Sequence, residues 1–212
     1  MFLSIDGPDG SGKSTQIKLL AHWLTAAGRN VVTCRDPGST PLGEAVRGIL
    51  LDRHDLAIHR RSEMLLYMAA RAQLVEEIIR PALAQGRAVL SDRYLLANVV
   101  YQGHAGGLDV ATLWEVGRSA TAGLMPDLTI VLDLPVAAAT GRMQRPLDRM
   151  ELQGESFHER VRQGFLAEAA RCPDHIVVLD AARPIETIQE EIRAQVQTLA
   201  ERSQSSQGTV VD

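Results

Sequence analysis

The chain has 212 residues, of which 45% are hydrophobic, so it is long enough to bury the core of one globular domain. Its formal net charge of −4 at pH 7 provides no broad attraction to nucleic acid or to anionic lipid. Because Cys34 and Cys172 form no CxxC pair and no apolar run approaches the roughly 20 residues of a membrane span, we expect a cytoplasmic protein that binds neither nucleic acid nor membrane.

Short apolar runs with β-strand character alternate along the chain with segments of helical spacing. The expected strands are 2–5, 31–34, 88–91, 128–134 and 176–179. The expected helices are one that contains 17–24 and ends before Gly28, then 62–84, 109–122, 135–143, 157–170 and 185–202. Because strands that alternate with helices form parallel sheets, the pattern predicts an α/β fold with a five-stranded parallel sheet flanked by helices.

The organisation along the chain predicts a single domain over residues 1–202. The charged segment 142–156 joins two expected helices and is interpreted as a short, arginine-rich mobile lid. Pro81 is expected to kink the last turn of the helix over 62–84. The polar stretch 203–212 is expected to be a disordered tail.

A phosphate-binding loop follows the first strand, where Gly7-Pro-Asp-Gly-Ser-Gly-Lys-Ser14 fits the pattern GxxxxGK[ST] and opens an amphipathic helix. Glycines let the backbone curl so that successive N–H groups point at phosphate oxygens. We expect Lys13 to bridge the β- and γ-phosphates of ATP and the Ser14 hydroxyl to ligate Mg²⁺. The alternative interpretation of this segment is a glycine-rich turn that binds no nucleotide. The ATP-binding set expected from the loop is Gly7, Pro8, Asp9, Gly10, Ser11, Gly12, Lys13, Ser14 and Thr15, of which Thr15 also suits a capping or packing role.

An acid and a base, Asp92 and Arg93, follow the third expected strand. They would lie at the carboxyl edge of the sheet, where ligands bind in open α/β folds. Asp92 suits a water-mediated contact with Mg²⁺, and Arg93 suits an acceptor phosphate. The alternative is a local salt bridge that caps the next helix.

Two other classes of P-loop protein fit the sequence poorly. A guanine-specific GTPase needs an [NT]KxD element, which cannot exist here because the only lysines are Lys13 and Lys18. A motor ATPase would occupy a larger or oligomerising module, and no second ATPase signature is present in the sequence. The remaining motifs must therefore decide what the nucleotide is used for.

Several motifs occur in the order found in thymidylate kinases: the P-loop, Arg-Asp-Pro-Gly-Ser-Thr at 35–40, Tyr-Met-Ala-Ala-Arg at 67–71, Asp-Arg-Tyr at 92–94, Tyr-Gln-Gly at 101–103 and Pro-Asp-Leu at 126–128. On these residues the sequence resembles bacterial thymidylate kinases over about residues 1–200. The resemblance implies a three-layer P-loop NTPase fold and transfer of the γ-phosphate of MgATP to dTMP, which gives dTDP and ADP in dTTP biosynthesis. It also implies a homodimer.

The resemblance implies how the base and sugar of dTMP are bound. Tyr67 matches the aromatic side chain that stacks on thymine, and Arg71, one helical turn further on, would reach the O4 edge of the base. Asn98 and Gln102 would complete recognition of that edge. Tyr101 corresponds to the residue that crowds the ribose 2′ position and favours deoxyribose. Without the resemblance, Tyr67 would equally suit the core, and either amide could be solvated.

The phosphate end of the acceptor site follows from the same resemblance. Arg93 and Arg47 match residues that hold the acceptor phosphate, and Asp36 stands where the family commonly has Glu. Asp9 matches an acid close to the acceptor 3′-hydroxyl and the metal. The dTMP phosphate oxygen is already ionised near neutral pH, so positioning and charge neutralisation suffice without a general base. The expected Mg²⁺ set is Ser14, Asp9 and Asp92.

The P-loop has no arginine of its own, and in this family the missing cation then comes from the lid. Arg142, Arg145 and Arg149 are the candidates, of which Arg149 is the first choice because the segment 148–151 resembles the family's lid element. Arg142 is also assigned to ATP binding. A solvated, charged helix connection is the alternative. The expected catalytic set is Lys13, Arg93, Arg149 and Asp9.

Some residues depart from the family pattern. Ser39 replaces the usual Gly, and Leu96-Ala97 replace an acid and a hydroxyl, which leaves selectivity against dUMP open. Another P-loop nucleotide or deoxynucleoside kinase is the nearest rival, although a neutral hydroxyl acceptor would favour an acidic base over arginines. A catalytically silent nucleotide-binding regulator would not explain acceptor and lid elements together.

Overall fold

The computed structural model describes residues 1–53, 55–142 and 148–207. Its centre is a five-stranded parallel sheet in the order β2-β3-β1-β4-β5, which confirms the expected fold class. Each observed strand covers an expected one to within a residue at either end. The strands are β1 (Phe2–Asp6), β2 (Val31–Arg35), β3 (Ala88–Asp92), β4 (Leu128–Asp133) and β5 (Ile176–Asp180).

Both faces of the sheet are buried, which explains why its central strands carry apolar residues that point to both faces. Leu3 and Leu90 point into one core, with helices α1 (Lys13–Ala26) and α9 (Ile185–Gln207), whereas Phe2 and Val89 point into the core on the opposite face. Side chains alternate between faces along a strand, so parallel strands covered on both sides need hydrophobic residues at every position.

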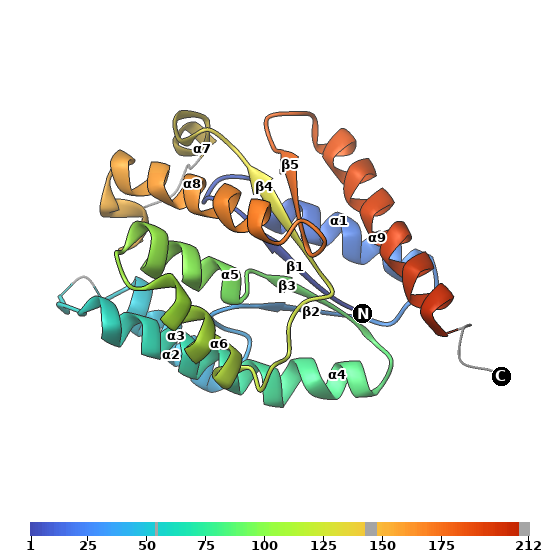
Figure 1. Cartoon of the computed structure of the whole chain (residues 1–212), viewed down its shortest axis with the longest axis horizontal. Coiled ribbons are helices and arrows are strands. Elements are labelled where there is room, and N and C mark those ends of the chain that lie inside the picture. The colour runs from blue at the N-terminus through green and yellow to red at the C-terminus, as the bar shows by residue number, and fades with distance from the viewer. Residues whose placement is uncertain (54, 143–147, 208–212) are drawn as a thin grey trace.

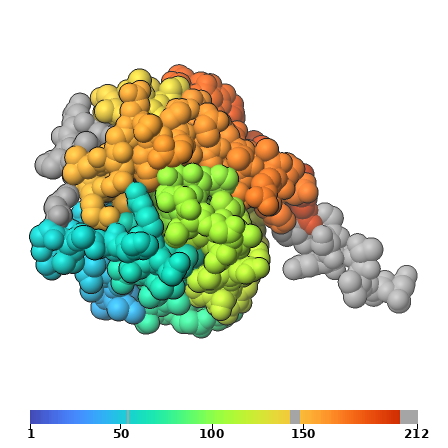
Figure 2. Space-filling model, turned by 60° about the vertical axis from the view of Figure 1, so that its left-hand side comes forward, coloured from blue at the N-terminus to red at the C-terminus, as the bar shows by residue number. Residues whose placement is uncertain are grey.

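The helices form one layer on each side of the sheet. Figure 1 shows α1 and α9 side by side on one face and the helices between β2 and β4, together with α8, on the other. Figure 2 shows α8, in orange, lying against the green segment that includes α5 and α6. The remaining elements are α2 (Pro41–Leu51), α3 (Arg60–Leu74), the π-helical turn η1 (Val75–Ile79), α4 (Arg80–Ala84), α5 (Leu95–Asn98), the π-helical turn η2 (Val99–Ala105), α6 (Val110–Ala120), α7 (Val136–Arg142), the 3₁₀ turn η3 (Glu151–Gln153) and α8 (Glu155–Arg171).

Two helical segments were not expected from the sequence. In α2, Gly43 and Gly48 lower the helix propensity, but the Thr40 hydroxyl caps the helix by accepting a hydrogen bond from the Gly43 N–H at 2.9 Å. The segment α5–η2 contains the β-branched pair Val99 and Val100, both fully buried, so packing rather than propensity makes it helical.

Two boundaries differ from expectation. The helix expected over 62–84 is divided by the π-helical turn η1, and Pro81 follows that turn at the start of α4. Helix α9 ends at Gln207, five residues beyond the end expected at residue 202. No helix among the described residues is long and apolar enough to cross a membrane.

Candidate active site

The phosphate-binding loop joins the carboxyl end of β1 to the start of α1. Gly7, Gly10 and Gly12 have φ values of 130°, 80° and 93°, a region that favours glycine. A Cβ atom at Gly7 would lie 2.4 Å from the carbonyl oxygen of Leu132, so the loop passes directly over the end of β4. The sequence pattern and its structural context therefore agree at this loop.

Lys13 is folded back over the loop. Its Nζ donates to the carbonyl oxygens of Pro8 at 2.8 Å and Gly7 at 3.2 Å, and only 8% of the residue is exposed. Burial, together with the neighbouring Arg93 cation, lowers the pKa of Lys13 to about 8. An ammonium group that has lost its water and sits beside another cation is well placed to attract phosphate oxygens.

The residues predicted to hold the metal lie at the mouth of this loop. Ser14 Oγ donates to Asp92 Oδ2 at 2.9 Å, and Asp9 lies 3.9 Å from the Lys13 ammonium. Within residues 1–53, 55–142 and 148–207, no cluster of three His, Cys, Asp or Glu side chains could hold a metal by itself. Hard oxygen donors in small number suit Mg²⁺, which keeps several waters and is usually completed by nucleotide phosphates. The chemistry of Ser14 and Asp92 therefore fits a nucleotide-bound Mg²⁺.

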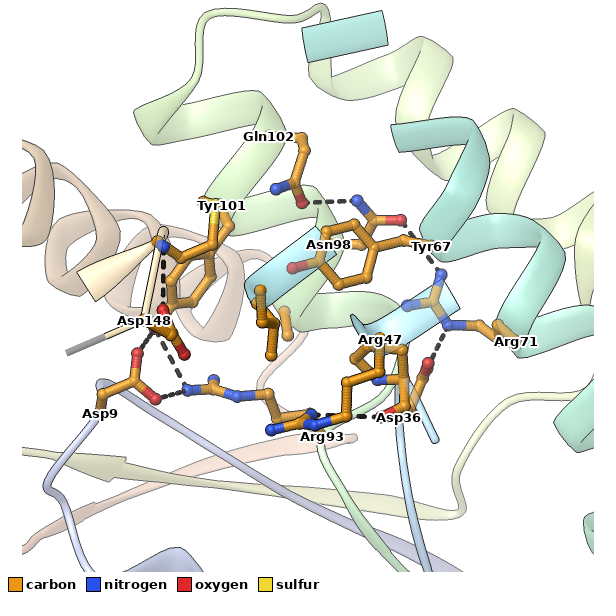
Figure 3. Close-up of a pocket in the computed structure, with 14 residues that line it drawn as sticks. Asp9, Asp36, Arg47, Tyr67, Arg71, Arg93, Asn98, Tyr101, Gln102 and Asp148 are labelled. Atoms are coloured by element: carbon orange, nitrogen blue, oxygen red, sulfur yellow. Dashed lines mark hydrogen bonds and ion pairs between the residues drawn. The ribbon is translucent and has the colours of Figure 1, made fainter. Parts of the chain in front are cut away.

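A second pocket adjoins the loop, and every side chain predicted to bind dTMP lines it. Figure 3 shows Asp9, Tyr101 and Asp148 at one end of this pocket and Arg71 with Asp36 at the other. These side chains come from the ends of β1, β2 and β3, from α2 and α3, and from α5–η2. The predicted acceptor residues that the structure brings together are Asp36, Arg47, Tyr67, Arg71, Arg93, Asn98, Tyr101 and Gln102.

Arg71 anchors one end of this acceptor pocket. The residue is 1% exposed, and its Nε donates to Asp36 Oδ2 at 2.5 Å. Burial raises the pKa of Asp36, while the Arg71 cation opposes that rise. Arg71 Nη1 also donates to Asn98 Oδ1 at 3.2 Å. The guanidinium is thus held in place by its neighbours, with its face 5.7 Å from the ring centroid of Tyr94.

Arg93 anchors the other end. Its Nη1 donates to the Gly7 carbonyl oxygen at 2.8 Å, and its Nη2 donates to Asp9 Oδ1 at 2.5 Å. The hydroxyl of Tyr101 donates to Asp9 Oδ2 at 2.8 Å. Burial alone would raise the pKa of Asp9, but the Arg93 and Lys13 cations lower it well below its ordinary value. Arg93 has φ 67°, an uncommon conformation for a residue other than glycine, and such conformations cluster at functional sites.

The loop and the acceptor pocket are parts of one continuous site. The cleft over the P-loop is lined by Lys13, Ser14, Thr15 and Asp92 from the nucleotide side. Asp9, Asp36, Arg47 and Arg93 line both this cleft and the acceptor pocket. Groups bound in the two parts would therefore meet beside Arg93 and Asp9.

The lid arginines have separate locations. Arg142 lines the cleft over the P-loop and donates from Nη1 to the Ala181 carbonyl oxygen at 3.1 Å. Arg145 lies outside the described residues. Arg149 donates from Nε to the Leu50 carbonyl oxygen at 2.7 Å and forms an ion pair with Glu63. Arg149 does not line the phosphate cleft, so this placement does not support its predicted action on the transferred phosphate.

Three charged residues at the site were not predicted from the sequence. Glu63 binds Gln102 and Arg149, Arg35 lines the phosphate cleft, and Asp148 lines the acceptor pocket. A usable signal existed for Glu63, since it lies four residues before Tyr67 and eight before Arg71 on one helix, which places all of them on one face. Arg35 ends β2 at the same sheet edge as Asp92.

The chain was compared with families of known proteins. The family model described as "Thymidylate kinase" matches residues 5–192. A thymidylate kinase of Rhodopirellula baltica is 48% identical over 91% of this chain and 78% of its own length. One from Clavibacter sepedonicus is 46% identical over 94% of this chain and 95% of its own length.

A solved structure is similar as well. The crystal structure of thymidylate kinase from Ehrlichia chaffeensis superposes with a TM-score of 0.76 at 29% sequence identity. The match covers 92% of this chain and 98% of that one. The likeness therefore extends through the sheet, the loop and the helices that build the acceptor pocket.

Proposed function

The chain belongs to the thymidylate kinase family and transfers the γ-phosphoryl group of ATP to dTMP, and we propose that the acceptor pocket and the P-loop cleft are the two halves of that site. The observation that carries the proposal is the junction at Asp9 and Arg93, where a pocket suited to a pyrimidine deoxynucleotide opens onto a nucleotide-phosphate loop. Neither rival accounts for this junction as well. A deoxynucleoside kinase would not need arginines at its acceptor end, and a silent binding module would not need an acceptor pocket.

The base and sugar of dTMP are bound at the end of the pocket formed by α3 and α5–η2. Tyr67 offers a ring face for stacking, and Arg71, Asn98 and Gln102 face the polar edge of the base. Tyr101 is held by its hydrogen bond to Asp9, so its ring cannot move aside to admit a ribose 2′-hydroxyl. This arrangement supports selection of a deoxyribonucleotide.

The acceptor phosphate lies between Arg93 and Arg47. Arg47 Nη1 donates to the Pro37 carbonyl oxygen at 3.2 Å, which orients its guanidinium along the shared wall. Two guanidinium groups can bind one phosphate dianion from two sides and aim an oxygen at the γ-phosphorus for in-line attack. Since that oxygen is already ionised, the attack releases no proton and needs no base.

The donor phosphates lie in the P-loop cleft. Backbone N–H groups at the start of α1 and the Lys13 ammonium bind the β- and γ-phosphates, and Arg142 contributes a cation from the lid side. Ser14, Asp92 and Asp9 would hold a Mg²⁺ ion, which would supply positive charge against the nucleotide phosphates. Arg93, Lys13 and Arg142 then stabilise the charge that spreads over the equatorial oxygens in the transition state.

The family membership further supports a cytoplasmic homodimer. Leu42 and Ile49 on α2 and Leu65 on α3 are 47%, 37% and 51% exposed, and α2 and α3 pack against each other. A symmetric partner that covers this apolar surface would bury it in the way that homodimer interfaces do. Sedimentation equilibrium would report the dimer, and a monomer at all concentrations would reject it.

The function is tested by mixing the purified protein with MgATP and each of dTMP, dUMP, the ribonucleotide of thymine, dCMP, AMP and thymidine. ADP and the phosphorylated acceptor are measured together. We expect dTMP to be converted fastest, with kcat for Arg93→Met lowered at least about 100-fold, which corresponds to about 2.7 kcal/mol of transition-state stabilisation. ATP binding without phosphorylation of any monophosphate would reject the kinase function.

A further inference from the structure

Glu63 is a buried acid that the proposed phosphoryl transfer leaves without a role. It is 0% exposed, and both of its oxygens are occupied. Oε1 accepts from Gln102 Nε2 at 2.8 Å and from Arg60 Nη1 at 3.2 Å, while Oε2 pairs with Arg149 Nη2. Glu63 thus joins an amide of the acceptor pocket to Arg149 of the lid segment.

The hydrogen bonds that lead from Arg71 to Glu63 all run in one direction. Arg71 Nη1 donates to Asn98 Oδ1 at 3.2 Å, Asn98 Nδ2 donates to Gln102 Oε1 at 2.6 Å, and Gln102 Nε2 donates to Glu63. A guanidinium only donates and a carboxylate only accepts, so the two charged ends fix the orientation of both amides. If both amides were turned over, Asn98 would present its NH₂ to Arg71 and Gln102 its oxygen to the carboxylate.

Amides that cannot turn present one fixed pattern of donors and acceptors to the base. Thymine carries an N3–H donor beside an O4 acceptor, whereas cytosine carries an N3 acceptor beside a 4-amino donor. An amide free to rotate can serve either base, because its two ends are nearly equal in shape. Asn98 and Gln102 are 2% and 1% exposed, so water does not compensate for a mismatched orientation.

We propose that Glu63, with Arg149 as its counter-cation, is a positioning residue that selects the base by locking the amides of Gln102 and Asn98 against rotation. The inference rests on the proposed function, since it concerns the acceptor of the same site. Arg149 acts through Glu63: its guanidinium is held by the carboxylate and by the Leu50 carbonyl oxygen, away from the phosphate cleft. A buried carboxylate that loses a cationic partner is strongly disfavoured, so removal of Arg149 disturbs the same amides.

The test compares kcat/KM for dTMP, dUMP and dCMP in the wild type and in Glu63→Gln. Glutamine keeps the size of the side chain but can donate as well as accept, so the chain is no longer fixed at the end that holds Gln102 and only Arg71 constrains it. We expect the dTMP to dCMP ratio to fall about tenfold or more, because a recognition amide can now turn toward the 4-amino group. The dTMP to dUMP ratio stays unchanged, since uracil presents the same N3–O4 edge.

Arg149 variants separate this inference from a direct role of the arginine in catalysis. Arg149→Met should lower the dTMP to dCMP ratio as Glu63→Gln does, Arg149→Lys should preserve it, and the double variant should be no worse than the more affected single variant. Arg149 is 15% exposed in its side chain, so the Met and Lys pair decides the question even if Glu63→Gln does not fold. A uniform loss of kcat on dTMP and dUMP with an unchanged dTMP to dCMP ratio overturns the inference.

A matched control is available in the same protein. Glu168 is also a buried acid, 2% exposed, and binds His104 Nε2 at 2.8 Å and Trp114 Nε1 at 3.1 Å away from the acceptor pocket. Glu168→Gln should leave both substrate ratios unchanged, and an equal shift there would show that any buried glutamate alters selectivity, which would overturn the inference. Failure of the wild type to phosphorylate dTMP rejects the proposed function itself.

Discussion

Asp6 is a buried acid at the end of β1 whose charge opposes folding. It is 0% exposed, its Oδ2 accepts from Ser4 Oγ at 2.6 Å, and its Oδ1 has no hydrogen-bond partner among the described residues. Burial raises the pKa of Asp6 to about 6 from an ordinary value of 3.8, although Ser4 and the nearby Arg93 and Lys13 cations lower it in part. The ionised Asp6 carboxylate, with one oxygen that accepts no hydrogen bond, therefore lowers the free energy of unfolding of the protein.

We predict that Asp6→Asn changes the pH dependence of the unfolding free energy. Between pH 4 and 6 the native state binds more protons than the unfolded state, so the wild type loses stability as pH rises through this window. The loss amounts to up to about 3 kcal/mol for a shift of about two pKa units, and it is complete above pH 6. Asparagine does not titrate, so the stability of the variant relative to the wild type should rise by that amount between pH 4 and 7.

Urea unfolding of both proteins at pH 4, 5, 6 and 7 measures this difference, whatever constant offset the amide introduces. Parallel stability curves for the two proteins over this range would contradict the prediction. Ser4→Ala is a useful companion variant. It removes the hydrogen bond that favours the charged form, so it should steepen the pH dependence of the wild-type background.

Individual residues of the site were predictable from sequence where they belong to a local motif. Lys13 and Ser14 follow from the P-loop pattern, and Tyr67 and Arg71 follow from the ordered motifs of the family. Arg149 was assigned to the phosphates from its resemblance to the family's lid element, and its partner Glu63 lies 86 positions away in the chain. A pairing between two charges so far apart in sequence leaves no local pattern, and only the fold reveals it.

At the scale of the element, the P-loop depends on a close backbone contact with β4 that leaves no room for a side chain. Gly7 has φ 130°, and a Cβ atom added to it would lie 2.4 Å from the Leu132 carbonyl oxygen. We predict that Gly7→Ala displaces the loop from β4 and lowers kcat/KM for ATP at least about 100-fold, with a loss of stability of about 1–3 kcal/mol from backbone strain.

Gly141→Ala is the matched control for that variant. Gly141 is exposed in α7, and an added Cβ would meet no atom within 4 Å. Alanine should therefore stabilise α7 by up to about 1 kcal/mol and leave ATP turnover unchanged. Steady-state kinetics with ATP, calorimetric ATP binding and thermal unfolding are measured for both variants. Normal ATP affinity in Gly7→Ala would show that the loop tolerates the displacement.

The elements themselves were predictable to different degrees. The strands and the helices α1, α6, α7 and α8 follow from apolar runs and regular spacing, since burial on both faces of the sheet leaves a strong signal. The segment α2 was missed because glycines weaken its local preference, and α5–η2 was missed because buried valines suit a strand equally well. These two segments carry Arg47, Asn98, Tyr101 and Gln102, so the acceptor pocket was identified from motifs and not from secondary structure.

At the scale of the whole molecule, the two cysteines report how the sheet opens. Cys34 lies on β2, is 6% exposed, and packs with Phe2 and Val89 in the core. Burial raises the pKa of Cys34 to about 12, so in the native state it is almost entirely an unreactive thiol. Cys172 is exposed after the end of α8. One thiol should therefore be modified quickly in the native protein, and the other only when the sheet opens.

We predict that Cys34 in a Cys172→Ser variant is modified about 10,000-fold more slowly when ATP and dTMP are each present at about 100 times their dissociation constants. Each ligand binds only the native state and so reduces the open population about 100-fold. The modification rate is measured by mass spectrometry, and its dependence on urea distinguishes two openings. If the modification rate depends on urea concentration as steeply as global unfolding does, Cys34 becomes accessible only when the whole domain unfolds. A rate independent of urea and of both ligands would instead mean that β2 separates locally from β3, and that the edge of the sheet which carries Asp36 and Arg35 opens without unfolding the phosphate-binding core.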